Sequence, residues 1–185
     1  MLVEVSVSCD DDGATPKRFI SALPSCISQL QTLRLELYTT TETKEIYKLP
    51  EMPKLKKLVV LFFADGGENI FKMTALIRAS PSLEEFELKY EWGRLPRKDR
   101  EIKDSITSSP HHHLKSFKYS GYYGRHCDVA LLGYVLENCF ALEKIIIDPS
   151  GSYGLDKLNM EQIGRKNAKQ QLEPQIPEHV KLVIL

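Results

Sequence analysis

Leu30-Gln31-Thr32-Leu33-Arg34-Leu35-Glu36-Leu37 has a leucine at its first, fourth, sixth and eighth positions. The alternation from Leu33 onward is typical of a β-strand with one buried face. The same L-x-x-L-x-L spacing, strict or relaxed, occurs five more times along the chain. The six blocks are residues 2–7, 30–37, 55–62, 83–88, 114–119 and 142–147. Recurrence of one strand-like block predicts a repeated structural unit.

The leucines that begin five of these blocks measure the period of the repeat. Leu30, Leu55, Leu83, Leu114 and Leu142 follow one another at intervals of 25, 28, 31 and 28 residues. This period is the signature of a leucine-rich repeat, in which stacked units bury one another's leucines. We therefore expect an α/β leucine-rich-repeat solenoid, a short horseshoe arc with parallel strands on the concave face and helices or loops on the convex face. A single domain of about six rungs over residues 1–185 is expected.

Two segments between the blocks have helical periodicity. Residues 70–77 space their apolar side chains as a helix does, and Pro81 forces the chain out of helix after them. Residues 129–136 form the second segment, for which Asp128 is the expected N-cap. Each repeat is thus expected to run from strand through loop and helix to the next strand.

The connecting and terminal segments complete this expected organisation. Residues 38–52 and 92–110 are polar or charged and are expected to be insertions. Residues 121–124 and 151–154 begin and end with glycine, which indicates turns. Residues 159–185 are expected to form a polar helix followed by an apolar strand that closes the sheet as its last rung.

Composition excludes several partner classes. Lysine plus arginine equals aspartate plus glutamate at 25 each, so no basic excess is available to neutralise phosphates, and nucleic acid is not expected as a partner. The longest apolar run, residues 58–64, is far shorter than the roughly 20 residues of a membrane span, so no membrane partner is expected. The four cysteines, Cys9, Cys26, Cys127 and Cys139, are few and have no C-x-x-C spacing, so a disulfide framework is not expected. We expect an intracellular protein of the cytoplasm or nucleus.

Several phrases occur in a fixed order along the second part of the chain: LPEMPKLKKL at 49–58, ASPSLEEF at 79–86, HLK at 113–115, GYYG at 121–124, LENCFALEKI at 136–145 with Asp148-Pro149, and 177–185. Through these phrases, residues 50–185 resemble the C-terminal leucine-rich region of plant F-box proteins, including those that end in an FBD-type module. In that family an F-box precedes the repeats and binds a Skp-type adaptor of a ubiquitin ligase. This chain opens directly into a strand, so a Skp-type adaptor is not expected to bind it directly.

The resemblance implies the target-recognition region of an F-box-type ubiquitin-ligase receptor, or a truncated relative of one. The identity of the protein target does not follow from it. A second family is also similar over one repeat, because LPSCISQL at 23–30 resembles the repeats of plant intracellular immune receptors. A leucine-rich segment of such a receptor is therefore the alternative.

Strand alternation predicts which side chains form a recognition surface. If the leucines of each block point inward, the residues between them face the concave side of the sheet. The candidate partner-binding residues chosen by this rule are Arg34, Glu36, Tyr38, Val59, Leu61, Phe63, Glu87, Lys89 and Lys118. An apolar strip with aromatic and arginine neighbours suits a protein partner. The alternative is that a loop or the terminal segment covers Val59, Leu61 and Phe63.

Catalytic signals are weak. Residues 111–113 and 126–128 contain histidine, cysteine and aspartate, but their spacing matches no metal-site pattern, and a metal-dependent enzyme using this His-rich loop is a remote alternative. The glycine turns lack the pattern of a phosphate-binding loop. We expect a non-catalytic module with no cofactor.

Overall fold

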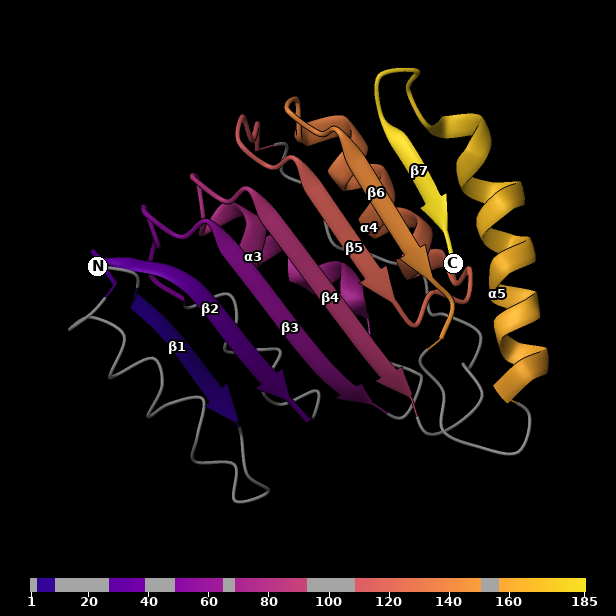
Figure 1. Cartoon of the computed structure of the whole chain (residues 1–185), viewed down its shortest axis with the longest axis horizontal. Coiled ribbons are helices and arrows are strands. Elements are labelled where there is room, and N and C mark those ends of the chain that lie inside the picture. Colours follow the sequence, from indigo (N-terminus) through magenta and orange to yellow (C-terminus); the bar gives the residue numbers. More distant parts are fainter. Residues whose placement is uncertain (1–2, 9–26, 39–48, 65–68, 93–108, 151–156) are drawn as a thin grey trace.

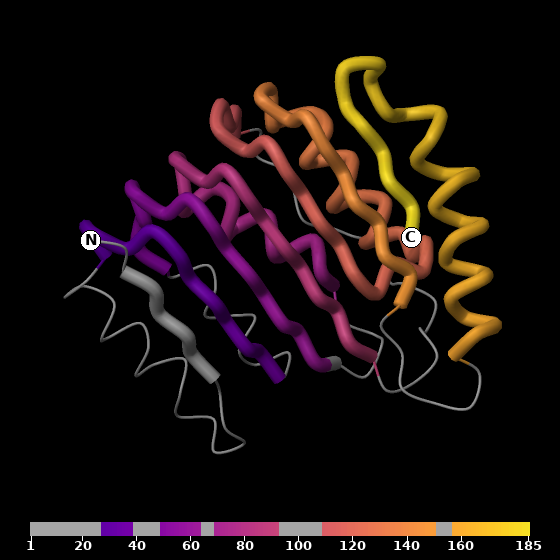
Figure 2. Tube along the Cα trace, in the orientation of Figure 1, coloured from indigo at the N-terminus to yellow at the C-terminus, as the bar shows by residue number. Residues whose placement is uncertain are grey.

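Seven parallel strands lie side by side in the order in which they occur along the chain (Figure 1). The computed structural model describes residues 3–8, 27–38, 49–64, 69–92, 109–150 and 157–185. The strands are β1 (Val3–Ser8), β2 (Leu30–Leu37), β3 (Lys57–Ala64), β4 (Glu85–Trp92), β5 (Ser116–Ser120), β6 (Lys144–Asp148) and β7 (Lys181–Ile184). β1 and β7 form the two edges of the sheet. The trace in Figure 2 crosses the sheet from β2, in indigo, to β7, in yellow.

Helices connect the later strands. A 3-10 turn, η3 (Ile70–Met73), and α3 (Thr74–Arg78) follow β3; α4 (His126–Asn138) follows β5; α5 (Lys157–Leu172) and η4 (Glu173–Gln175) precede β7. α3 and α4 lie behind the sheet in Figure 1. Cys9, Cys26 and the expected turn at 151–154 lie outside the described residues, as do most of the insertions expected at 38–52 and 92–110.

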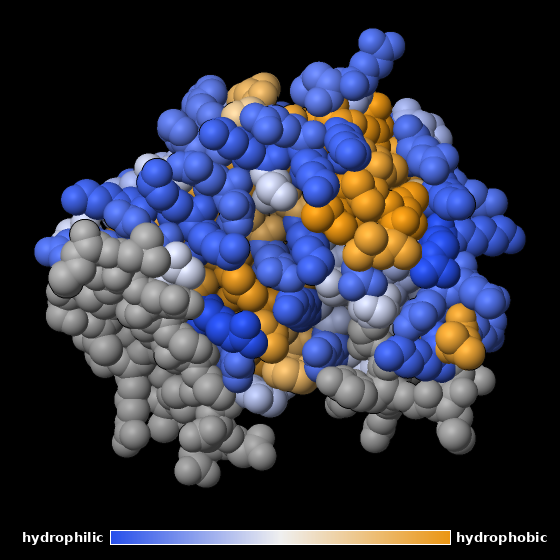
Figure 3. All heavy atoms as spheres, in the orientation of Figure 1, coloured by the Kyte–Doolittle hydropathy of each residue, from blue (hydrophilic) through white to orange (hydrophobic). Residues whose placement is uncertain are grey.

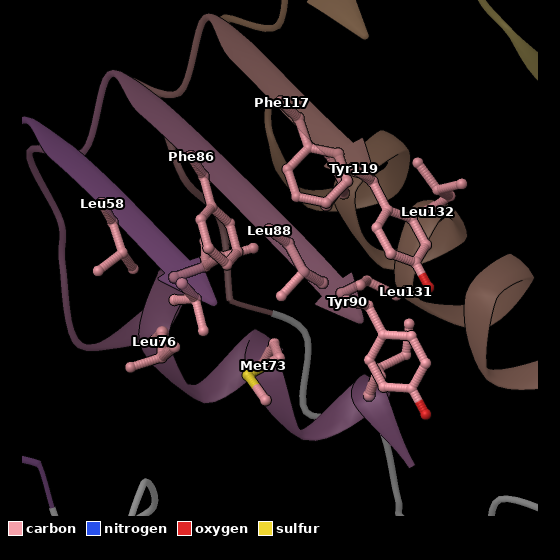
Figure 4. Packing of buried hydrophobic residues seen from close by; sticks show 14 of the residues in the cluster. Leu58, Met73, Leu76, Phe86, Leu88, Tyr90, Phe117, Tyr119, Leu131 and Leu132 are labelled. Carbon is pink, nitrogen blue, oxygen red and sulfur yellow. The ribbon is translucent and has the colours of Figure 1, made fainter. Parts of the chain in front are cut away.

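The strand register stacks like residues in rows across the sheet. One inward row is Leu33, Leu58, Phe86, Phe117, Ile145 and Leu182, and the next is Leu35, Val60, Leu88, Tyr119, Ile147 and Ile184. Figure 4 shows side chains of these rows on β3, β4 and β5 projecting toward the helix layer, which carries Met73 and Leu76 on η3 and α3 and Leu131 and Leu132 on α4. The core therefore lies between the sheet and the helices, where strand alternation predicts it.

A short turn precedes most strands and sets their start. The residue that begins the block donates its N–H to the carbonyl three residues earlier, at 2.9–3.4 Å, for Leu30, Leu55, Leu83, Leu142 and Val180. At Leu114 the N–H donates instead to Nδ1 of the His111 ring, at 3.1 Å. A histidine side chain thus replaces a backbone acceptor in one repeat.

The start of α4 differs from the sequence expectation. The expectation of Asp128 as N-cap is wrong: the helix begins at His126, Arg125 is the N-cap residue, and Asp128 is the third residue of the first turn. From there its carboxylate accepts the backbone N–H of Arg125 at 2.9 Å. An acidic side chain in the first turn satisfies otherwise unpaired N–H groups and suits the positive end of the helix dipole.

Glycine is required at the turn after β5. Gly121 and Gly124 both have φ of +90°. A Cβ at Gly121 would lie 2.0 Å from the carbonyl oxygen of Tyr90. The Gly121 carbonyl accepts a hydrogen bond from the indole of buried Trp92 at 3.3 Å. Trp92 is therefore a core residue that fixes this turn against β4.

Candidate binding surface

The face of the sheet turned away from α3 and α4, which we call the open face, carries every second residue of the strands (Figures 1 and 3). One row of residues in register across it is Arg34, Val59, Glu87, Lys118, Ile146 and Val183; the next is Glu36, Leu61, Lys89, Ser120 and Asp148. The nine candidate residues chosen from the sequence all belong to this face. Their role in binding stays a prediction.

An apolar group crosses from the end of β2 to β3, and we call it the β3 strip: Tyr38, Val59, Leu61 and Phe63. The rings of Tyr38 and Phe63 stack with centroids 4.7 Å apart and planes 10° from parallel. Val59 is only 8% exposed, whereas Leu61 and Phe63 are half-buried and Tyr38 is 37% exposed. The strip therefore offers two accessible aromatic rings over a buried base.

The terminal segment does not lie over this strip. β7 pairs with β6, at the opposite edge of the sheet from β1 and β2. The sequence leaves a loop or the terminal segment as alternative covers for Val59, Leu61 and Phe63. The structure places the terminal segment beside β6 instead.

Charged side chains border the β3 strip on both sides. Arg34 forms an ion pair with Glu36 at 3.4 Å on β2. On the other side, one carboxylate oxygen of Glu87 forms ion pairs with Lys118 at 3.0 Å and with Lys89 at 3.5 Å. Partial burial alone would raise the pKa of Glu87, but the hydrogen bond from Lys118 and the two lysine charges outweigh burial and lower it.

A second apolar group, which the sequence analysis did not select, lies at the other end of the open face. Ile146 on β6 and Val183 on β7 are in register, and each is half-buried. The pair Lys144 and Lys181 is in register two residues earlier. We call these four residues the β6–β7 patch; a broad apolar area covers β6 and β7 in Figure 3. Strand alternation in 180–185 could have indicated that Val183 lies on the open face. That Val183 lies beside Ile146 follows only from the register between β6 and β7.

A buried ionic cluster on the opposite side of the sheet joins β4, β5 and α4. Arg125 and Asp128 form an ion pair at 2.8 Å, with side chains 4% and 0% exposed. The guanidinium also donates to the hydroxyl of Tyr90 at 3.0 Å, and its carbon lies 4.4 Å from the centre of that ring. The Tyr119 hydroxyl donates to Asp128 at 2.8 Å.

Every polar group of this cluster has a counterpart. The Asp128 carboxylate also accepts the backbone N–H groups of Tyr123 and Gly124 at 3.2 and 3.0 Å. Burial would lower the pKa of Arg125, but the Asp128 charge outweighs it and the pKa is raised, so the cation persists. Burial, followed by the charge of Asp128, raises the pKa of Tyr119. The charges of this cluster are paired with one another inside the protein, so the cluster stabilises the fold and is not exposed for binding.

The His-rich segment is also structural. His111 is 5% exposed; Nε2 lies 2.8 Å from the carbonyl oxygen of Ser80 and Nδ1 accepts the N–H of Leu114. Burial lowers the pKa of His111, partly offset by the bond to Ser80. His112 and His126 are exposed on separate elements. Among the described residues, no group of three histidine, cysteine or acidic side chains could hold a metal ion.

The two described cysteines are buried and unreactive in character. Cys127 lies in the first turn of α4, beside Asp128, and Cys139 follows the last turn. Burial raises the pKa of Cys139 to about 12, so its thiol keeps its proton near neutral pH. Both thiols are buried and so lack the exposure of a reactive nucleophile.

The repeated strand, turn and helix units match a known domain family. The model of the leucine-rich-repeat (LRR) domain described as At1g61320/AtMIF1 matches residues 7–184. The chain belongs to this LRR family. No curated protein matches the chain, and no solved structure does.

Membership of the LRR family defines the fold class and the general role. The parallel sheet with its helices is an α/β leucine-rich-repeat fold. Such domains are protein-interaction modules and are typically non-catalytic. Among the described helices of this LRR domain, none is long and apolar enough to cross a bilayer.

Proposed function

We propose that this LRR domain binds a protein partner through the β3 strip on its open face. The observation that carries the proposal is the stacked Tyr38–Phe63 pair beside half-buried Leu61, bordered by the Arg34–Glu36 and Glu87–Lys118 ion pairs. Aromatic side chains in an apolar patch with a polar rim are the usual centre of a protein interface.

Differences in burial support the division between a structural and a binding side. The helix-facing rows are fully buried in the central strands, and their ionic cluster is saturated with partners. The open face instead carries half-buried apolar groups next to ion pairs that solvent reaches. A partner can bury the β3 strip without rearranging the core.

We further propose that the partner is a target protein of a ubiquitin-ligase receptor or of a truncated relative. The support is the resemblance of residues 50–185 to the F-box and FBD-type leucine-rich region. A segment of a plant immune receptor is the second candidate, supported by the single phrase at 23–30. The full-length transcript separates them by encoding an F-box or a nucleotide-binding domain.

The solenoid shape belongs to the same proposal. Seven parallel strands in sequential order support an arc of stacked repeats with the open face on its concave side. Small-angle X-ray scattering tests this shape: an arc predicts a larger radius of gyration and a longer maximum dimension than a compact particle of the same mass. A curve that fits a sphere would contradict it.

Affinity capture with matched variants tests the proposed surface. The wild type and a Leu61→Glu plus Phe63→Glu variant are used as bait, and captured proteins are quantified by mass spectrometry. We expect specific partners of the wild type to be lost from the variant. The control is Phe140→Glu plus Leu158→Glu, which changes two apolar residues that are 63% and 75% exposed elsewhere.

The controls make the result decisive. Leu61→Ala plus Phe63→Ala removes the same contacts without adding charge, and circular dichroism establishes that each bait is folded. Partners retained equally by a folded β3-strip variant would contradict the proposal. Partners lost from the control alone would assign binding to another surface.

A further inference from the structure

The β6–β7 patch has a charge arrangement that differs from the rest of the open face. Lys144 and Lys181 lie in register on adjacent parallel strands. Strands are separated by about 4.8 Å, and like charges directly across a ladder are unfavourable. Neither lysine takes part in an ion pair with any residue of the described ranges. Two neighbouring cations are therefore left without an internal anion.

Other positions on the same sheet avoid this arrangement by alternating charge between strands. Lys57 on β3 pairs with Glu85 on β4 at 2.9 Å, and these residues are in register. Glu87 on β4 pairs with Lys118 on β5 at 3.0 Å, also in register. The fold thus matches opposite charges where strands meet, and the β6–β7 patch departs from that rule.

The nearest acid along β6 is already held by other groups. Asp148 accepts the hydroxyl and N–H of Ser150 at 2.6 and 2.9 Å, and the hydroxyl of Ser120 at 3.3 Å. It is also four residues beyond Lys144 on the strand, about 13 Å away at the usual rise. Its carboxylate does not compensate Lys144 or Lys181.

Apolar surface adjoins the two cations. Ile146 and Val183 follow Lys144 and Lys181 by two residues, on the same face and in register with each other. Both are half-buried, and Lys118 of β5 is the next residue in their row. A ligand that fits this patch needs a negative group for the lysines and an apolar group beside it.

We propose that the β6–β7 patch binds an acidic segment of a protein partner, with a carboxylate between Lys144 and Lys181 and a large apolar side chain over Ile146 and Val183. The inference rests on the proposed function in taking the partner to be a protein. Two lysines beside aliphatic side chains match a carboxylate next to a hydrophobic residue.

The charge of the wider surface favours a carboxylate over a phosphate backbone or an anionic lipid. The chain has 25 basic and 25 acidic residues, and Glu87 and Asp148 share the open face with the patch. Polyanions need a broad basic surface, because each neutralised phosphate adds to affinity. An isolated pair of lysines suits one or two carboxylates.

The spacing of the two apolar groups indicates how a single segment could use both. β3 and β6 are three strands apart, about 14 Å at the usual strand separation. An extended segment lying across the strands covers this distance in about four residues at roughly 3.3 Å each. One partner segment can therefore contact the β3 strip and the β6–β7 patch with side chains about four positions apart.

Peptide selection followed by affinity measurement tests the inference. The whole chain is used to select from a displayed library of random peptides, and selected peptides are titrated by fluorescence anisotropy. We expect enrichment of acidic residues next to a large apolar residue. Lys144→Glu plus Lys181→Glu should weaken their binding roughly tenfold or more, because charge-pair partners at an interface are lost. Added salt should weaken binding to the wild type.

A matched control separates a local effect from a change of net charge. Lys166→Glu plus Lys169→Glu makes the same charge change on exposed positions of α5 and should leave affinity unchanged. The single variant Lys181→Glu places opposite charges in register and should raise the melting temperature. Loss of peptide affinity in this more stable variant would not be loss of folding.

Several results would overturn the inference. It fails if selected peptides are not acidic, or if the Lys144 and Lys181 variant binds them as well as wild type. It also fails if phosphatidylserine vesicles, and not peptides, bind with dependence on these lysines. If peptides depend on Leu61 and Phe63 alone, this inference fails while the proposed function holds. If no peptide binds, this inference fails, and affinity capture tests the proposed function separately.

Discussion

Two ionic clusters lie on opposite faces of the same sheet and differ in burial. On the helix side, Arg125 and Asp128 are almost completely buried and are enclosed by Tyr90 and Tyr119. On the open face, Glu87 and Lys118 form a pair at 3.0 Å, against 2.8 Å for the buried pair, yet their side chains are 23% and 34% exposed. The same chemistry is structural on one face and accessible to a partner on the other.

The difference follows from what each cluster would lose if it were opened. Removing one partner of a buried pair leaves an uncompensated charge in the interior, whereas water replaces a lost partner at the surface. Residues of the open-face cluster can therefore be exchanged, or recruited by a partner, at little cost to folding.

The largest effect is expected at Asp128. Asp128→Asn leaves the Arg125 guanidinium buried without its counter-charge and weakens the acceptor for three backbone N–H groups. Breaking a buried pair in this way costs about 3–5 kcal/mol. Urea denaturation of the variant measures the loss. A free energy of unfolding within 1 kcal/mol of wild type, roughly the value of an exposed pair, would contradict a structural role for the cluster.

A smaller loss is expected at Tyr90. Tyr90→Phe keeps the ring beneath the guanidinium but removes the hydroxyl that accepts from Arg125 at 3.0 Å. An unsatisfied buried donor costs about 1–3 kcal/mol. The same denaturation experiment should show this loss together with unchanged partner capture. Loss of capture by a stable Tyr90→Phe protein would mean that the two faces are coupled.

The buried His111 should make stability depend on pH. Its folded pKa lies below the ordinary value of 6.5, so the unfolded chain binds the extra proton first as the pH falls. Stability linked to this residue is therefore complete above pH 6.5 and is lost as the pH drops toward the folded pKa. The urea midpoint should fall over this window, and His111→Gln should reduce the slope. An equal slope in both proteins would exclude His111 as the cause.

The smallest stability effect is expected at Glu87. Glu87→Gln removes the acceptor charge for Lys118 and Lys89 on a surface that solvent reaches, so the expected loss is under about 1 kcal/mol. The folded pKa of Glu87 is lowered, so its stabilisation is present above pH 4.5 and is lost as the pH falls through the folded value. Thermal melts at low and high salt check this. A loss as large as that of Asp128→Asn would remove the distinction between the faces.

Strand alternation in the sequence was enough to predict the sheet faces. Leu33 and Leu35 face the helices and Arg34 and Glu36 face away, because the period of a strand is two and one face is buried. Residues 70–77 were likewise predicted as helical, and η3 with α3 confirms this. These features depend only on local periodicity.

Features that depend on long-range placement could not be predicted in the same way. Asp128 was expected to be an N-cap, since aspartate favours that position. It instead occupies the third position of the helix, where its carboxylate accepts the N–H groups of the preceding turn, Tyr123, Gly124 and Arg125. The His111 ring replaces a backbone carbonyl as acceptor for the Leu114 N–H. The other nitrogen of the ring contacts the Ser80 carbonyl of the neighbouring repeat, a contact that local sequence does not indicate. Lys181 faces Lys144 only because of the register between β6 and β7.

We propose a division of roles in which the open face binds a protein while the helix side maintains the fold. The most direct measurement is the dissociation constant of a captured partner for wild type and for Leu61→Glu plus Phe63→Glu, each shown to be folded by its unfolding transition. We expect the affinity to fall about 100-fold or more, as at an interface centre, with the free energy of unfolding changed by less than about 1 kcal/mol. An unchanged dissociation constant in the folded variant would contradict the account.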